Sequence, residues 1–272
     1  MKKKIAFISL AVLFSRQVSF SQDTANHYSL KLKIEIPAVV AGAAFCAYNF
    51  AGISKKTSSD PVFVEGLNKS DVNWFDRWGV RPYNKTADNQ SYIPFYVAVP
   101  LPLVVFVFDK KLRKDFFKLS FLYAEAMIST GVLYSSAAHF VNRLRPLVYD
   151  AESPLNKRTS SDSKKSFFAG HVALVATSTF FVARVLADYH PDSRFKWLYY
   201  SIAGAATVTT AYLRQAAGEH FLSDILVGTT VGTLSGLITP ALHKNSFFKN
   251  QRLSLYPFNG HNSNGFTALY RL

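Results

Sequence analysis

The chain has 272 residues, of which 31 are lysine or arginine and 17 are aspartate or glutamate, giving a net charge of +14. The basic residues are spread over several short segments instead of gathering with aromatic side chains on one domain. The charge is therefore typical of contact with anionic lipid head groups and argues against a nucleic-acid-binding protein. The single cysteine, Cys46, excludes a disulfide framework or a cysteine metal site within one chain.

The first residues have the pattern of a secretory signal peptide, which we predict over residues 1–21. Lys2 to Lys4 form a basic start, Ile5 to Phe14 form an apolar core, and Ser19-Phe20-Ser21 provide a cleavage context. Arg16 and Gln17 fit a signal less well, so an uncleaved amphipathic anchor is the alternative. Either a signal peptide or an anchor would direct the chain to a membrane.

Six stretches of the sequence are long and almost free of charged residues. Each approaches the about 20 residues that an α-helix needs to cross a bilayer, and buried helices of a soluble protein rarely come in six such lengths. We therefore predict an all-α integral membrane bundle of about six helices over residues 34–243, with an extramembrane tail over residues 244–272. The stretches are Ile36–Ser54, Asn89–Phe108, Leu119–Asn142, Ser166–Ala183, Trp197–Leu213 and Ile225–His243.

The connection between the first two stretches, Lys55 to Asp88, contains two tryptophans, Trp74 and Trp78, at helical spacing. Such a pair is typical of an interfacial helix that lies at head-group depth. A peripheral binding site is the alternative.

Prolines and one acidic residue mark the second and third stretches. The second stretch contains Pro94, Pro100 and Pro102, so we expect a kinked or partly irregular helix. The third contains Glu125 about two turns from its start. An ionisable residue at that depth indicates a functional role, with a polar contact inside the bundle as the alternative.

Two further segments lie outside the predicted helices. The loop Tyr149 to Lys165 is rich in serine, lysine and aspartate and is long enough to act as a lid or substrate lip. In the tail, apolar and polar residues alternate on both sides of Asn259-Gly260, which predicts a short hairpin outside the membrane.

Three clusters of polar residues lie at the ends of the apolar stretches. They are Arg143-Leu-Arg145-Pro146, Ala169-Gly170-His171, and the pattern Arg-x5-His-x3-Asp formed by Arg214, His220 and Asp224. In a bundle whose helices alternate in direction, the end of the third helix, the start of the fourth and the turn between the fifth and sixth lie on one side. We therefore predict that the three clusters form one site.

The third cluster combines the residue types of a nucleophilic histidine and an anion clamp. If one helix contains both His220 and Asp224, the carboxylate can accept the Nδ1–H and leave Nε2 free as a base or nucleophile. Arg214 adds a permanent charge with a planar fork that suits phosphate. Taken alone, the triplet also fits a membrane helix with ordinary polar flanks, and the other two clusters favour a site.

These residues, in this order, resemble the type 2 phosphatidic acid phosphatase family, which shares its site with vanadium-dependent haloperoxidases. The family pattern is Lys-x6-Arg-Pro, then Pro-Ser-Gly-His, then Ser-Arg-x5-His-x3-Asp, and the membrane members have a six-helix core. The matching residues are Arg145, Pro146, Gly170, His171, Arg214, His220 and Asp224.

Four positions depart from the family pattern. Ala138 stands at the position of the lysine, Phe168 and Ala169 at the Pro-Ser pair, and Leu213 at the leading serine. Losing one charge-assisted contact to phosphate costs about 1.5–3 kcal/mol. The cations that could replace the missing contacts are Arg143, Lys164 and Lys165, and His139 adjoins the position of the missing lysine.

The resemblance implies phosphoryl transfer without a metal or a cofactor. By analogy, His220 attacks phosphorus and forms a phosphohistidine, while Asp224 fixes its tautomer. His171 protonates the leaving oxygen and later activates water.

The resemblance also implies a set of groups that hold the phosphate. Arg145 and Arg214 contact its oxygens, and the missing side chain of Gly170 lets its backbone N–H approach closely. Arg143 is a further candidate for substrate binding.

The implied function is that of a membrane phosphatase acting on a lipid phosphate or pyrophosphate. The candidate substrates are polyprenyl pyrophosphate, phosphatidate, phosphatidylglycerophosphate and the phosphates of lipid A. The expected partners are this substrate and the membrane lipids, with no nucleic acid, and the oligomeric state stays open.

A catalytically impaired relative that binds anionic lipid or a protein partner is the alternative, motivated by Ala138 and Ala169. A transporter would carry ionisable residues along several helices, and only Glu125 is so placed.

The distribution of basic loops predicts on which side of the membrane the site lies. Lys110 to Lys118 and Arg194 to Lys196 lie on the side opposite the clusters, which favours a site on the periplasmic or external face. A cleaved signal followed by a first helix that crosses the membrane would instead place the site inside.

Overall fold

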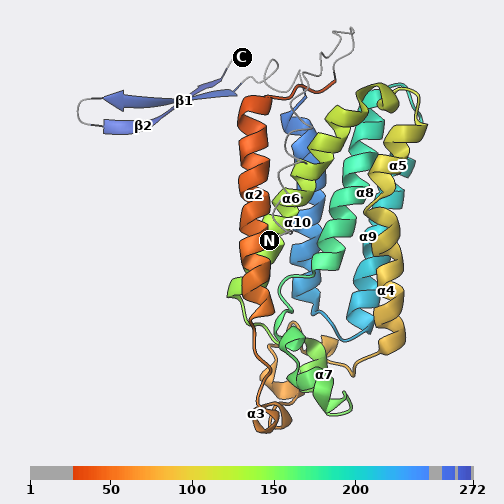
Figure 1. The fold of residues 1–272 in the computed structure, drawn as a ribbon, viewed down its shortest axis with the longest axis vertical. Coiled ribbons are helices and arrows are strands. Elements are labelled where there is room, and N and C mark those ends of the chain that lie inside the picture. Colours follow the sequence, from red (N-terminus) through yellow and green to blue (C-terminus); the bar gives the residue numbers. More distant parts are fainter. Residues whose placement is uncertain (1–26, 245–252, 261–262, 271–272) are drawn as a thin grey trace, which may run out of the picture.

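The computed structural model describes residues 27–244, 253–260 and 263–270. In this part of the chain, long helices form a bundle, short helices cover one of its ends, and a two-stranded hairpin lies beyond the other end (Figure 1). The predicted signal or anchor, residues 1–21, lies outside the described residues.

The bundle has six helical rods that alternate in direction, one of them broken into two helices. Along the chain they are α2 (Leu32–Ser54), α4 (Lys85–Ala98) with α5 (Leu101–Phe108), α6 (Phe116–Phe140), α8 (Gly170–Tyr189), α9 (Lys196–Ala216) and α10 (Leu222–Leu242). The predicted all-α bundle is confirmed.

The break in the second rod lies at its prolines, as expected. Pro94 lies inside α4, and Pro100 precedes the first residue of α5. Proline has no N–H to donate to the preceding turn, so the helix ends at Ala98 and restarts at Leu101.

Short helices cover the end of the bundle where α2 finishes and α8 begins (Figure 1). They are α3 (Pro61–Glu65), η2 (Lys69–Asp71), η3 (Arg77–Gly79), η5 (Pro146–Tyr149), α7 (Leu155–Thr159) and η6 (Ser161–Lys164), while η4 (Leu112–Asp115) lies before α6 at the other end.

The predicted interfacial helix around the two tryptophans is wrong. Trp74 lies in a turn and Trp78 in the short η3. Asn73 accepts a hydrogen bond from the N–H of Asp76 through its side chain at 3.1 Å, which stabilises a turn in place of a helix. Both tryptophan side chains are nevertheless exposed.

Helix α8 is the centre of the bundle and packs against α10 and α9. On α10, a stripe of Gly228, Gly232 and Gly236 faces α8, and a Cβ atom at any of them would lie within 2.6 Å of a backbone oxygen of α8 or of the residue before it. The small residues therefore let the two backbones approach closely, as at many helix contacts within membranes.

Five helical segments in the described part of the chain are long and apolar enough to cross a membrane. They are Leu32–Ser54, Lys85–Phe108, Leu112–Phe140, Gly170–Tyr189 and Leu222–Leu242. The sixth rod, α9, forms as predicted but is not among these segments, and alanine, serine, threonine and glycine make up much of its length. Outward-facing aromatic and aliphatic side chains cover the bundle, as expected of an integral membrane protein.

The loop from Tyr149 to Lys165 is folded onto the end of the bundle. Its buried Arg158 donates hydrogen bonds to the carbonyl oxygens of Val148 at 2.9 Å and Val64 at 2.7 Å. The loop is therefore a fixed wall in this structure and not a detached lid.

The predicted C-terminal hairpin is confirmed. Strands β1 (Leu253–Gly260) and β2 (Ser263–Tyr270) pair antiparallel, with Leu253 opposite Tyr270. The hairpin lies beyond the end of the bundle where α2 begins (Figure 1).

Candidate active site

The fold brings the three predicted clusters to the same end of the bundle. Arg143 and Arg145 follow the end of α6, Gly170 and His171 begin α8, and the third cluster spans the end of α9 and the start of α10. The alternation of helix direction inferred from hydropathy therefore placed these segments correctly (Figure 1).

His220 lies in the turn between α9 and α10 and is 3% exposed. Its Nδ1 is 2.7 Å from the backbone oxygen of Ser166. Because a carbonyl oxygen only accepts, Nδ1 carries the proton and Nε2 keeps its lone pair. Burial, together with the nearby charges of Arg214 and Arg145, lowers the pKa of His220 well below 6.5, so the ring is neutral at neutral pH.

The expected direct contact between Asp224 and His220 is not formed. Helix α10 begins at Leu222, so His220 precedes the helix and does not share a face with Asp224. The carboxylate instead accepts hydrogen bonds from the Ser166 hydroxyl at 2.6 Å and the Phe221 N–H at 3.0 Å. Asp224 thus fixes Ser166, and the Ser166 carbonyl in turn fixes the tautomer of His220.

Arg143 also differs from its expected role in substrate binding. Its guanidinium contacts Asp224 and Asp76, each at 2.6 Å, and the Ser223 hydroxyl at 2.9 Å. Burial raises the pKa of Asp76, but hydrogen bonds from Ser223, Asn73 and Arg143 outweigh this effect and lower it overall. Arg143 is therefore held by two carboxylates and positions the start of α10.

Arg145 and Arg214 meet at one carboxylate, that of Glu219. Arg214 donates to Glu219 at 2.9 Å, and Arg145 contacts the same Glu219 oxygen, Oε2. Each arginine also contacts a second carboxylate, with Asp88 2.6 Å from Arg214 and Asp162 2.8 Å from Arg145. The two predicted clamp arginines are therefore brought together, with their forks converging on a single anionic group.

Sequence reasoning missed Glu219 and Asp76 as members of this network. Glu219 is 4% exposed and Asp76 is 2% exposed. A signal for Glu219 was present, because an acidic residue directly before His220, among arginines, requires a partner once it is buried. Asp76 had no such signal, since it lies far from the clusters in the sequence.

His171 occupies the first turn of α8 at the same end. Its ring lies edge-on to Tyr92 and Phe95, with centroids 4.9 Å apart in both pairs. Within the described residues we find no hydrogen bond to this ring, so both nitrogens are available to a ligand. A Cβ atom on Gly170 would lie 2.5 Å from the ring of Tyr134, so the missing side chain also makes room for that tyrosine.

The residues at the departing positions are apolar and mostly buried. Ala138, Phe168 and Ala169 are buried, and Leu213 is half-buried, so none of the four provides a polar contact from its side chain.

Of the lysines that could replace the missing one, Lys165 contacts a residue that also contacts the clamp. Its Nζ is 3.3 Å from Asp162, the second carboxylate that contacts Arg145. Lys164 instead donates to the backbone oxygen of Thr57 at 2.8 Å, and His139 pairs with Asn49 at 3.0 Å. His139 thus contacts α2 and Lys164 contacts the loop that follows α2, and neither of these contacts is with the arginines.

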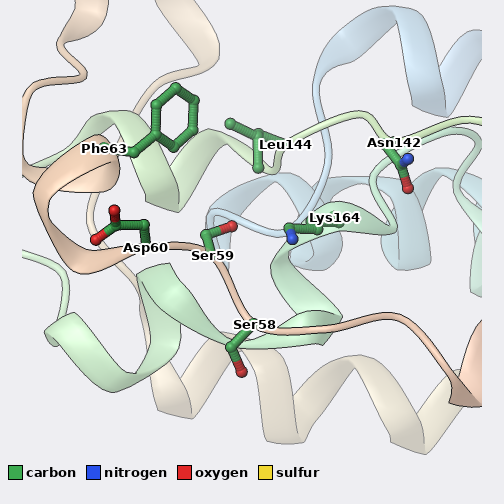
Figure 2. Close-up of a pocket in the computed structure, with 7 residues that line it drawn as sticks. All are labelled: Ser58, Ser59, Asp60, Phe63, Asn142, Leu144 and Lys164. Atoms are coloured by element: carbon green, nitrogen blue, oxygen red, sulfur yellow. The ribbon is translucent and has the colours of Figure 1, made fainter.

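A surface pocket of about 330 Å³ lies beside the site, between the α3 segment and the loop after α6 (Figure 2). Its lining is Ser58, Ser59, Asp60, Phe63, Asn142, Leu144 and Lys164. None of the proposed catalytic residues lines it, so we regard it as a neighbouring hollow and not as the reaction site.

The comparison with protein families agrees with the geometry. The family model of the PAP2 superfamily matches residues 119–248. This match covers somewhat less than half of the chain. The PAP2 match includes Arg143, Arg145, His171 and the whole third cluster, and it supports a lipid phosphatase activity in general terms.

One solved structure similar to this chain is described as the first transmembrane PAP2 type phosphatidylglycerolphosphate phosphatase from Bacillus subtilis. The two are 19% identical, the match covers 79% of this chain and 98% of the other, and the TM-score is 0.45. No curated protein matches the sequence.

Proposed function

We propose that the protein is a membrane phosphatase that removes phosphate from a lipid phosphate or pyrophosphate by way of a phosphohistidine. The observation that carries this proposal is the state of His220. The ring is buried and neutral, its Nδ1–H is bound by the Ser166 carbonyl, and its Nε2, near two arginines, has no hydrogen-bond partner among the described residues. This is the form that a histidine nucleophile needs.

In the proposed reaction, the His220 Nε2 lone pair attacks phosphorus and the bond between phosphorus and the lipid oxygen breaks. His171, which enters this step protonated, gives its proton to that leaving oxygen and becomes neutral. A water molecule then loses a proton to His171 and attacks phosphorus, so the P–N bond breaks and inorganic phosphate leaves. Arg145, Arg214 and the N–H groups at the start of α8 stabilise the charge on the phosphoryl oxygens. These steps need no metal ion.

The substrate is proposed to keep its tail in the bilayer while its phosphate reaches the end of the bundle. This fits a site placed where membrane helices end. The test is a panel of phosphatidate, phosphatidylglycerophosphate, polyprenyl pyrophosphate and lipid A, assayed with purified protein in the presence of a chelator. Release of phosphate from one class supports the proposal. A protein that is folded and releases none contradicts it.

The same arginine pair also supports a second candidate, an impaired relative that binds anionic lipid. Ala138 and Ala169 stand where the family has polar side chains, and Glu219 takes the contacts that a phosphate would make. This candidate predicts vesicle binding that depends on anionic lipid, without phosphate release from any member of the panel.

Glu219 gives a prediction about phosphate affinity. In Glu219→Gln, the arginines keep a hydrogen-bond acceptor but lose the negative charge that competes with phosphate. We therefore expect inorganic phosphate to bind about five- to tenfold more tightly. This corresponds to the difference of about 1 kcal/mol between hydrogen bonds to a charged and to a neutral acceptor. Calorimetric titration with phosphate measures this without turnover. Glu152→Gln, in an exposed part of the loop, is the control and should leave the affinity unchanged. Weaker phosphate binding in Glu219→Gln would show that Glu219 does not compete.

We propose that the site faces the periplasm or the outside of the cell. Helix α2 has 23 residues, and at 1.5 Å per residue it is ~35 Å long, enough to cross the bilayer. A cleaved signal before α2 would place the site inside, so this proposal requires residues 1–21 to remain as an anchor on the cytoplasmic side.

Labelling of single cysteines in intact cells tests this topology. In a Cys46→Ala background, Glu152→Cys lies at the site end and Asp192→Cys at the opposite end, and both positions are exposed. We expect a membrane-impermeant maleimide to label the first and not the second. The reverse pattern would place the site inside and favour a cleaved signal.

A further inference from the structure

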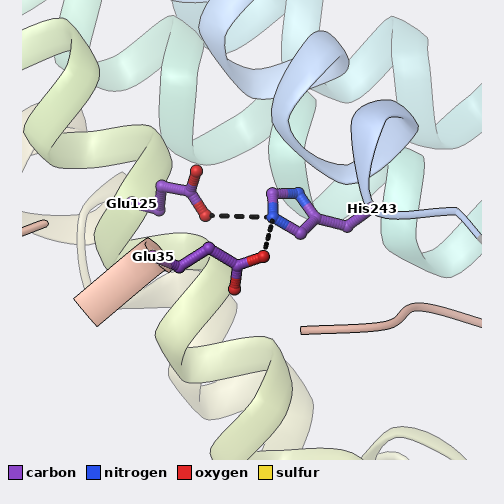
Figure 3. Close-up of side chains that lie close together, drawn as sticks. All are labelled: Glu35, Glu125 and His243. Atoms are coloured by element: carbon purple, nitrogen blue, oxygen red, sulfur yellow. Dashed lines mark ion pairs between the residues drawn. The ribbon is translucent and has the colours of Figure 1, made fainter. Parts of the chain in front are cut away.

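A second cluster of ionisable side chains lies toward the end of the bundle opposite the proposed active site. Glu35 comes from the first turn of α2, Glu125 from α6, and His243 from the residue after α10. All three side chains converge on one point, with one ring nitrogen of His243 facing both carboxylates (Figure 3). One ligand atom from each residue lies within 4.8 Å of the others.

The distances do not fit an ordinary histidine–carboxylate hydrogen bond. The His243 Nε2 is 3.2 Å from Glu35 Oε1 and 3.4 Å from Glu125 Oε2. A charge-assisted hydrogen bond is about 2.7–2.9 Å long, and the His190–Asp109 pair of this protein has that length, 2.8 Å. Two ligand atoms that share a tetrahedral Zn²⁺ at about 2.0–2.1 Å are about 3.3–3.4 Å apart. The two distances from His243 Nε2 are close to this second spacing.

The orientation of His243 is also that of a metal ligand. Its Nδ1 is 2.8 Å from the backbone oxygen of Thr239, so Nδ1 carries the proton. The Nε2 of a neutral ring then directs a lone pair at two carboxylates, which is repulsive unless a cation lies between them. A backbone carbonyl on the distal nitrogen is the usual partner of a metal-bound imidazole.

Charge balance favours a divalent ion over a proton. In the described part of the chain, the ion pairs of Glu35 and Glu125 both go to His243. Protonation of His243 would leave the cluster with one net negative charge within a membrane bundle, where uncompensated charge is costly. A divalent cation brings the net charge to zero. In addition, Glu35 Oε2 and Glu125 Oε2 are buried without a hydrogen-bond partner among the described residues.

We propose that Glu35, Glu125 and His243 bind a Zn²⁺ ion. One imidazole and two carboxylates are a donor set that zinc accepts, and the fourth position is left for water. The ion fastens the start of α2 to α6 and α10. It adds a side-chain link at this end of α2, whose buried residues, Asn49 and Ile53, both lie near its other end. The link lies beside the backbone hydrogen bond from the Ser29 N–H to the His243 oxygen at 2.8 Å. The site is structural and separate from the proposed phosphohistidine chemistry.

Zinc binding by the full chain, purified without a polyhistidine tag, tests the proposal. We expect one bound Zn²⁺ per chain by elemental analysis and a melting temperature that rises with Zn²⁺ and falls with a chelator. Glu125→Gln and His243→Asn should each weaken zinc binding at least about tenfold. Even the loss of a residue that only hydrogen-bonds to a metal ligand typically lowers metal affinity by this factor. His190→Asn removes a histidine–carboxylate pair without these features and should bind zinc as the native chain does.

The measurements are stoichiometry and melting temperature, so they do not depend on phosphatase turnover. Native protein that binds no zinc in micromolar Zn²⁺, or equal zinc binding by Glu125→Gln and His190→Asn, overturns the proposal. If His243→Asn does not fold, Glu35→Gln, which keeps the volume of the side chain, provides the same comparison.

Discussion

His220→Ala is expected to lower phosphate release at least about a thousandfold, because removal of a nucleophile takes away the whole covalent route. The His220 ring also donates to the Ser166 carbonyl, so alanine should cost about 1–3 kcal/mol of folding free energy by leaving that oxygen unpaired. His220→Asn retains a side-chain donor and separates the two effects. Equal loss of turnover in both variants, with a higher melting temperature for asparagine, is the expected result.

The matched control for this prediction is His139→Ala. His139 lies at the same end of the bundle, but its ring pairs with Asn49 of α2 and not with the arginine clamp. We expect nearly native turnover. Labelled phosphate should be trapped on the native protein after rapid denaturation in alkali, and should be missing from both His220 variants. Turnover by His220→Ala within tenfold of native would rule out a phosphohistidine at this position.

The second large effect is expected for Arg214, which is 2% exposed. Arg214→Ala leaves Asp88 and Glu219 without one of their cations, and breaking a buried ion pair in this way costs about 3–5 kcal/mol of folding free energy. Arg214→Lys keeps the charge but loses the fork that reaches both carboxylates. We therefore expect a smaller loss of stability and a fall in kcat/KM of about ten- to a hundredfold, the value of one charged contact to phosphate.

Arg184→Lys is the control for this substitution. Arg184 pairs with Asp188 at 2.9 Å with 28% of its side chain exposed, near the other end of α8. The change should cost less than about 1 kcal/mol, as for partly solvated pairs. Denaturant unfolding and phosphatase kinetics on both variants provide the comparison. If Arg214→Lys retains native kcat/KM, the fork of Arg214 does not hold the transferred phosphate.

Hydropathy was sufficient to predict the bundle, because a helix that crosses a bilayer must be continuously apolar over its length. The same pattern gave the direction of each helix and hence the shared end of the three clusters. Pro100 also marked the break in the second rod, since its effect on the backbone is local. The tryptophan helix was predicted wrongly because the Asn73 side chain, and not the spacing of the tryptophans, decides the local backbone.

The individual contacts of the candidate site depended on the tertiary structure. The sequence pairs Asp224 with His220 by spacing, but α10 starts two residues too late for that contact, and Ser166 lies between them in space. Arg143 is taken up by Asp76, from a segment that carries no motif.

The sequence by itself determined the membrane bundle, the end at which the polar clusters meet and the residue types of the site. Only the tertiary structure decided which carboxylate holds which cation, that Glu219 joins the two arginines, and that Glu35, Glu125 and His243 meet at the opposite end. The physical reason is the distance along the chain over which each property is determined. Hydropathy and helix direction are properties of continuous segments, whereas an ion pair is fixed by side chains from separate helices whose approach depends on packing of the whole bundle.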